Sequence, residues 1–169
     1  MTELKDKDKD TKAIKAVIQK FFDAINAADT DALGSHFSAN ANLTIIRQEP
    51  PLPPSSSDSK ATADEEVIKV VIRTTIEKFI ALLEDGKKQR EGKPGPELHE
   101  APDLDGTDVK IDALFASAWS PFKVTFDGAL HHYGVMVYTL GKDNGEWKIE
   151  GLTQSYRRTP GWERSESVL

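Results

Sequence analysis

The sequence contains no cysteine, and this absence removes several kinds of chemistry. Disulfide bonds, thiolate nucleophiles and cysteine-ligated zinc all require that side chain. No apolar run approaches the roughly 20 residues of a membrane-spanning helix. The N-terminal segment also lacks the apolar core of a signal peptide, because charged residues fill most of its first ten positions. We therefore expect a soluble, cytoplasmic protein.

Clusters of positive charge are also missing. The chain has 22 Lys and Arg against 28 Asp and Glu, and its formal net charge is -6. A phosphate backbone requires a concentrated basic surface, so nucleic acid is not an expected partner. Gly-rich phosphate loops, nucleophile elbows and zinc-binding helix motifs do not occur in the sequence either.

The length and composition favour one domain. The chain has 169 residues, of which 38% are hydrophobic, so it can bury one core but has little room for two. We expect a single domain over residues 12–158. In this scheme residues 1–11 are a charged, flexible N-terminus and residues 159–169 are a C-terminal tail.

A single apolar stripe predicts the first helix. Its members recur at intervals of three and four residues, which places them on one helical face. They are Ile14, Val17, Ile18, Phe21, Phe22 and Ile25. Asp29 or Thr30 can cap a short second helix over residues 31–37, and a strand is expected over residues 42–47.

Two stretches are expected to be solvated loops. Residues 48–63 contain four prolines and four serines, and residues 85–108 are rich in glycine, proline and charge. Loops of this length often carry function, so either could close over a pocket as a lid. Between them, a broad apolar surface predicts a long helix from about Asp64 to Glu84, with Thr62 and Glu65 at capping-box spacing.

Turn signals divide residues 113–158 into strand-like runs at hairpin spacing. The Asp-Gly pair at 127–128 and the Asp-Asn-Gly run at 143–145 predict two tight turns. Pro121 cannot donate to a strand ladder, so we expect it to mark a bulge or a bend. The pattern predicts an antiparallel meander that follows the helices in the chain.

Helices followed by a long curved sheet predict an α+β cone, with the N-terminal helices packed on a strongly curved antiparallel or mixed sheet. In the first strands of the meander, the residues that point to one face and the residues that point to the other face are both largely apolar. The helices can cover only one of these faces. We expect a second copy of the chain to cover the other, in a homodimer.

Several short motifs within this outline resemble one group of proteins. They are Ala116-x-x-Trp119-x-Pro121-Phe122, Asp127-Gly128-x-Leu130-x-His132-x-Gly134, Gly145-x-Trp147-Lys148-Ile149, and Leu152-Thr153 with Arg157-Arg158. The pattern resembles the SnoaL-like branch of the nuclear transport factor 2-like superfamily. That resemblance implies a cystatin-like cone, usually dimeric, with a pocket between the helices and the concave sheet. It leaves the activity open, because such proteins include isomerases, cyclases, dehydratases, hydrolases and non-catalytic domains.

His132 is the first candidate for catalysis, because it matches the family pattern and because imidazole titrates near neutral pH. A histidine that is bonded to a neighbouring strand or exposed at the turn is the alternative. Tyr138 shares its strand face and could donate a hydrogen bond to a ligand, although an ordinary core position also explains it. Arg47 and Glu49 follow the first strand and could form a pair at the pocket edge, although a solvated strand end also explains them. The expected chemistry is general acid/base catalysis without a cofactor, such as isomerisation, cyclisation, dehydration or hydrolysis.

Phe22, Trp119 and Met136 are expected to line the pocket and to bind a small apolar or aromatic molecule. Met136 stands where an enzyme of this kind would carry a polar side chain, and a thioether moves no protons. That substitution favours the alternative of a ligand-binding or dimerisation module without catalysis. No metal site is expected, because His131 and His132 are strand neighbours that should point to opposite faces.

Overall fold

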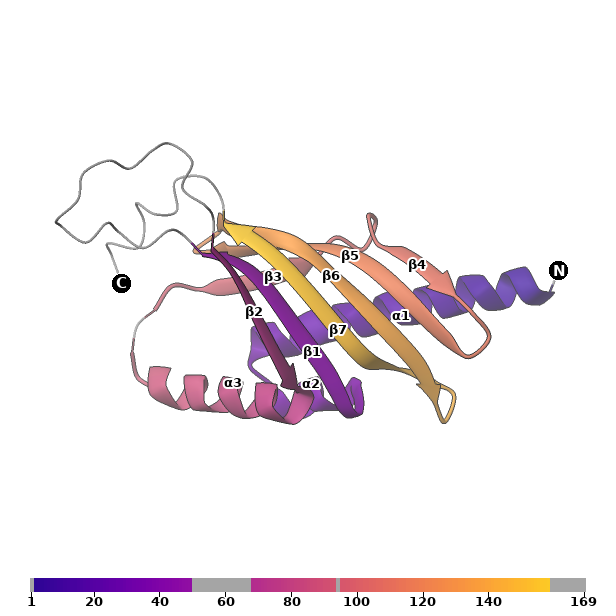
Figure 1. The fold of residues 1–169 in the computed structure, drawn as a ribbon, viewed down its shortest axis with the longest axis horizontal. Coiled ribbons are helices and arrows are strands. Elements are labelled where there is room, and N and C mark those ends of the chain that lie inside the picture. The colour runs from indigo at the N-terminus through magenta and orange to yellow at the C-terminus, as the bar shows by residue number, and fades with distance from the viewer. Residues whose placement is uncertain (1, 50–67, 94, 159–169) are drawn as a thin grey trace.

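The structure is a computed structural model that describes residues 2–49, 68–93 and 95–158. Figure 1 shows α1 crossing one side of the sheet, with α2 and α3 near the β2–β1 edge. Neither α1 nor the other described helices are long and apolar enough to cross a membrane. The elements, in chain order, are α1 (Thr2–Ala27), α2 (Thr30–Ser35), β1 (Phe37–Glu49), β2 (Ile68–Thr75), α3 (Ile76–Arg90), β3 (Leu98–Pro102), β4 (Asp108–Ile111), β5 (Phe115–Phe126), β6 (Ala129–Asp143) and β7 (Glu146–Arg158).

The described strands form one seven-stranded sheet in the order β2-β1-β7-β6-β5-β3, and β4 also pairs with β5. β1 and β7 run parallel, whereas the other neighbouring strands are antiparallel. The sheet is therefore mixed, and the predicted α+β architecture is confirmed.

The two hairpin turns of the meander lie where the sequence predicts them. Asp127 and Gly128 have φ angles of 48° and 80°, and Asn144 and Gly145 have 49° and 83°. Two successive left-handed residues form the tight turn whose twist matches that of paired strands. These turns fix the register of β5 against β6 and of β6 against β7.

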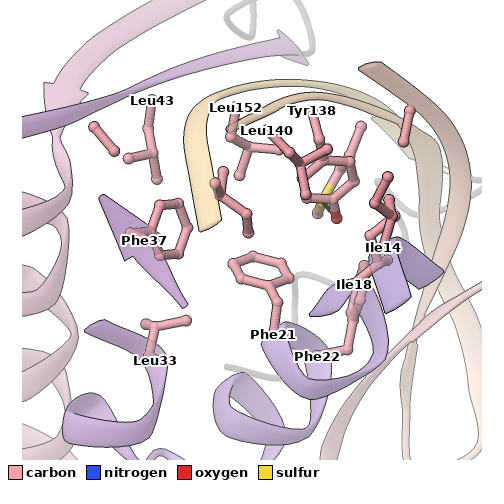
Figure 2. Packing of buried hydrophobic residues seen from close by; sticks show 14 of the residues in the cluster. Ile14, Ile18, Phe21, Phe22, Leu33, Phe37, Leu43, Tyr138, Leu140 and Leu152 are labelled. Atoms are coloured by element: carbon pink, nitrogen blue, oxygen red, sulfur yellow. Dashed lines mark hydrogen bonds between the residues drawn. The ribbon is translucent and has the colours of Figure 1, made fainter. Parts of the chain in front are cut away.

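The core lies between α1 and the sheet face turned toward the helices, which we call the inner face (Figure 2). The predicted stripe of α1 is confirmed, since Ile14, Ile18 and Phe22 are all 0% exposed. The Phe21 ring lies 6.2 Å from the Tyr138 ring on β6, in edge-to-face contact. Aromatic pairs of this geometry contribute about 0.5–1.5 kcal/mol beyond the burial of their area.

Helix α1 begins at Thr2, earlier than the predicted domain start at residue 12. Lys and Asp alternate through residues 5–10, which places opposite charges three residues apart on the helix, where they attract. Asp10 also accepts hydrogen bonds from Lys142 Nζ at 2.9 Å and from Trp147 Nε1 at 3.1 Å. The lysine contact, followed by the indole bond, lowers the pKa of Asp10. These contacts join the early turns of α1 to the β6–β7 hairpin.

The prediction of one helix from Asp64 to Glu84 is wrong over residues 68–75, which form β2. Six of these eight residues are β-branched, and such side chains favour strands. Because Ile and Val recur every four residues here, the same pattern also fits a helical stripe. The helix begins only at Ile76, after Thr75, whose hydroxyl accepts from Lys78 N at 3.5 Å.

The prediction of a loop over residues 85–108 is also wrong in part. α3 continues to Arg90, and residues 98–102 form β3, which pairs with the end of β5. The first predicted loop lies mostly outside the described residues, as do Thr62, Glu65 and the predicted tail. Pro121 does not mark a bulge, because it pairs in register with Val135 within a continuous β5.

Candidate functional site

Burial on the inner face decreases along three neighbouring strands toward the same end of the sheet. On β6, Tyr138 and Met136 are 0% and 1% exposed, whereas His132 is only partly buried. On β7 the change runs from Leu152 to Tyr156, and on β1 from Leu43 to Arg47. Among the described residues, the helices therefore cover one end of these three strands more completely than the other end.

We call this other end of the inner face the rim, and define it by the inward side chains that share it; on β5 these side chains, Phe122 and Val124, are still buried. In the sheet register, Arg47 pairs with Tyr156 across β1 and β7, and Val124 of β5 pairs with both His132 of β6 and Glu100 of β3. Paired residues of neighbouring strands project from the same face. The rim thus consists of Arg47, Glu100, Phe122, Val124, His132 and Tyr156.

Glu100 carries the one carboxyl group among the rim residues, and the sequence did not predict it as a site residue. Its backbone is fixed by the side chain of Asn26 on α1, whose Oδ1 accepts from Glu100 N at 2.7 Å and whose Nδ2 donates to Glu100 O at 2.8 Å. Within the described part of the chain, its carboxyl group forms no hydrogen bond or ion pair. Burial raises the pKa of Glu100 to about 7. The group is therefore divided between acid and carboxylate at neutral pH.

Tyr138 lies deeper on the same face and is 0% exposed. Its hydroxyl donates to Met136 Sδ at 3.1 Å, and a thioether is a weak acceptor. Burial, and secondarily the charge of Glu100, raise the pKa of Tyr138 well above its ordinary value. Tyr138 is therefore a neutral donor, and it is close enough to Glu100 for the two to interact electrostatically.

His132 and His131 lie together, which the strand alternation did not predict. Val124 pairs with His132 while Thr125 pairs with Leu130, so His131 is the extra residue of a β-bulge. The two Nδ1 atoms are 2.9 Å apart, so one ring donates to the other. The prediction that the two rings point to opposite faces is therefore wrong.

Aromatic rings surround His132 on the inner side. The Tyr156 ring lies 4.6 Å from it and the Phe122 ring 6.4 Å, and Phe122 in turn lies 6.2 Å from Phe22 of α1. The rim therefore combines an apolar, aromatic wall with a few titratable groups. This composition is typical of small-molecule sites.

The predicted ligand-binding residues are divided between two faces. Phe22 and Met136 face inward, but they are 0% and 1% exposed and belong to the packed core. Trp119 is 57% exposed on the opposite, outer face, between the buried residues Ala118 and Ser120. The expectation that Trp119 lines the interior is wrong, because the inward positions of β5 are the even-numbered residues from 116 to 124.

A separate hollow of about 610 Å³ lies between the α1–α2 turn and the end of α3. Its lining is charged, and part of that charge is already engaged. Thr30 Oγ1 donates to Glu84 at 3.2 Å, and Lys87 Nζ donates to the carbonyl of Ala28 at 3.3 Å. This hollow is an open surface groove and contains none of the rim residues.

A metal centre finds no support in the described ranges, where no three His, Asp or Glu side chains converge. Arg47 lies on the inner face near the end of β1, and its Nε is buried. Its predicted role at a pocket edge stays a prediction. Four strand spacings separate it from Glu100, or about 19 Å along the sheet. Arg47 and Glu100 therefore lie at opposite sides of the rim.

No protein-family model matches the sequence, and no curated protein matches it. Solved structures do resemble the chain. A conserved protein from Planctomyces limnophilus is 15% identical with a TM-score of 0.59, over 89% of this chain and 98% of that one. A domain of unknown function with a cystatin-like fold from Nostoc punctiforme is 18% identical with a TM-score of 0.56, over 95% and 83%. An NTF2-like protein of unknown function from Shewanella baltica is 16% identical with a TM-score of 0.51, over 90% and 96%.

Identities this low show the fold alone. The order of helices and strands, the mixed sheet and these structural likenesses agree with one another. The chain therefore has the cystatin-like fold of NTF2-like proteins.

Proposed function

We propose that this chain is a SnoaL-like small-molecule-binding protein whose site is the rim, and that Glu100 exchanges a proton with the bound molecule. The proposal rests on the buried carboxyl group of Glu100. Burial raises the pKa of this group to about 7. A group with a pKa near the working pH serves equally as an acid and as a base. Strongly shifted groups of this kind cluster at functional sites.

The proposed chemistry is general acid/base catalysis without a cofactor, in the class of isomerisation, cyclisation, dehydration or hydrolysis. Glu100 takes the first role because it is the inward carboxyl group of the rim. His132 lies two strand spacings away, or about 10 Å, on the far side of Val124, and supplies a second proton carrier. Tyr138 lies deeper on the same face, where its hydroxyl is a neutral donor.

The second candidate is a binding or dimerisation module without catalysis. Large apolar side chains on the outer face of β5 and β6 favour it, because Phe115, Trp119 and Tyr133 are 51%, 57% and 40% exposed. A second copy of the chain can cover this face in a homodimer, and such a dimer is compatible with either function.

Chemical-shift mapping with a small aromatic probe such as benzyl alcohol tests the proposed site. We expect the shifts to concentrate on the rim, at Glu100, Phe122, His132 and Tyr156. The Trp119→Ser variant is the matched control, because it alters an aromatic residue of the outer face, and it should bind the probe as the unmodified protein does. Shifts that follow the outer face, or that disappear in Trp119→Ser, would contradict a ligand site at the rim.

A further inference from the structure

Glu100 lacks any counter-charge in the described part of the chain. Neither an arginine, a lysine nor a hydrogen-bond donor reaches its carboxyl group there, and burial alone accounts for its altered ionisation. Burial disfavours a carboxylate that has no partner, and either protonation or a nearby cation removes this penalty. The residue is still partly exposed, so a molecule at the rim can reach it.

The surroundings of the carboxyl group are apolar. Val124 lies directly opposite on β5, and Phe122 is the diagonal neighbour on the same face. Phe122 belongs to the ring cluster that includes Phe22, and His132 connects this cluster to Tyr156. Phe122 and Val124 are themselves 4% and 0% exposed, so the rings of this face that a ligand can reach are the partly exposed rings of His132 and Tyr156. A carboxylate that shares a face with such rings matches a cation that carries apolar substituents, because both the charge and the ring faces attract it.

The titratable groups near Glu100 do not change its preference for a cationic ligand. Tyr138 on β6 interacts with it electrostatically and stays neutral. Asn26 of α1 holds the backbone of Glu100 and carries no charge. His132 lies about 10 Å away by strand spacing, and Arg47 lies about 19 Å away along the sheet. An anionic ligand would find no cation at this side of the rim among the described residues.

We propose that the molecule bound at the rim is a small aromatic or apolar amine whose ammonium group pairs with the Glu100 carboxylate. This inference rests on the proposed function and adds the chemical class of the ligand. No covalent step is required. Binding needs the ionised form of Glu100, so a proton leaves the protein when the amine binds below neutral pH.

Titration calorimetry with benzylamine and benzyl alcohol tests the inference, because the two probes share size and ring but differ in charge. An alkylamine of this type stays protonated from pH 5 to pH 8. Since only about one Glu100 in a hundred is ionised at pH 5, benzylamine should bind about 100-fold more weakly there than at pH 8. The affinity for benzyl alcohol should change little across the same range.

Two variants complete the experiment. Glu100→Gln should lose the binding of benzylamine and its pH dependence while keeping that of benzyl alcohol. Glu97→Gln, an exposed neighbour, should behave as the unmodified protein does. Calorimetry in two buffers of different ionisation enthalpy should show about one proton released per amine bound near pH 5.

The possible failures separate the two proposals. If both probes bind at the rim with equal affinity and no pH dependence, the amine inference is overturned and the rim remains the binding site. If benzyl alcohol binds and benzylamine does not, the amine inference is likewise overturned. If neither probe binds and Glu100 titrates at the ordinary value for a glutamate, the proposed function and the amine inference both fail.

Discussion

Replacing Glu100 with Gln should stabilise the ligand-free protein at pH 8 and change its stability much less at pH 5. Burial raises the pKa of Glu100 from 4.5 to about 7. Between these values the folded protein binds more protons than the unfolded chain, so the free energy of unfolding falls as the pH rises. The loss is absent below pH 4.5 and complete above pH 7. Glutamine keeps the shape of the side chain and removes the charge that causes the loss.

The size of the effect follows from the same two pKa values. A difference between 4.5 and about 7, at about 1.36 kcal/mol per unit, corresponds to up to about 3 kcal/mol at pH 8. At pH 5 most of the folded protein carries protonated Glu100, so the gain should stay under about 1 kcal/mol. A stabilising polar substitution of this size is uncommon, because most substitutions destabilise a protein.

Chemical unfolding at pH 5 and pH 8 measures both values. Glu97→Gln removes an equal charge from an exposed position nearby, so it corrects for the change in net charge. A gain of equal size at both pH values, or a loss at pH 8, would refute the argument that Glu100 is a buried and unpaired carboxyl group.

Three further outcomes are expected. Gly134→Ala should destabilise the protein by at least about 2 kcal/mol in thermal unfolding, because a Cβ at Gly134 would overlap the backbone carbonyl of Ser155; unchanged stability would contradict the close approach of β6 and β7. Asp10→Ala should cost about 1 kcal/mol by loss of its two bonds to the β6–β7 hairpin. Hydrogen exchange should then rise in the first turns of α1, and equal protection in both proteins would argue against this role. Trp119→Lys should convert the proposed homodimer to monomers in sedimentation without lowering thermal stability, whereas an unchanged mass would remove Trp119 from any interface.

Local signals predicted much of this fold. The apolar stripe of α1 lies wholly within the sequence of that helix. The Asp-Gly and Asn-Gly turns adopt left-handed backbone angles that these residues tolerate. The alternation in β6 correctly placed Met136 and Tyr138 on the inner face. In each case the information lies within a few residues of the chain.

The errors occur where distant segments decide the structure. β3 has no clear apolar alternation, and it exists because the edge of β5 pairs with it and because Asn26 binds its backbone. The sequence predicts a loop over residues 85–108, and a loop gives no reason to place Glu100 on the inner face of a sheet. The segment from Leu98 to Pro102, in which Glu100 stands between His99 and Ala101, contains no local signal for an inward carboxyl group.

The β-bulge at His131 has a similar origin. Strict alternation through β6 places His131 and His132 on opposite faces. The bulge instead adds one residue of β6 opposite the Val124–Thr125 pair of β5, and it brings the two rings into hydrogen-bond contact. Bulges depend on how two strands fit each other, and neither strand alone predicts them. The parity of His132 with Met136 and Tyr138 is still correct, because the bulge begins after His132 toward the turn.

The most direct test of this account is the titration of Glu100 itself. Carbon-13 NMR of the side-chain carboxyl groups, with Glu100→Gln used to assign the signal, reports the pKa of Glu100 in the ligand-free protein. We expect a midpoint near pH 7, because burial without a partner disfavours the carboxylate. A midpoint near 4.5, the ordinary value for this side chain, would mean that Glu100 is solvated and would contradict its role as the proton-exchanging group of the rim.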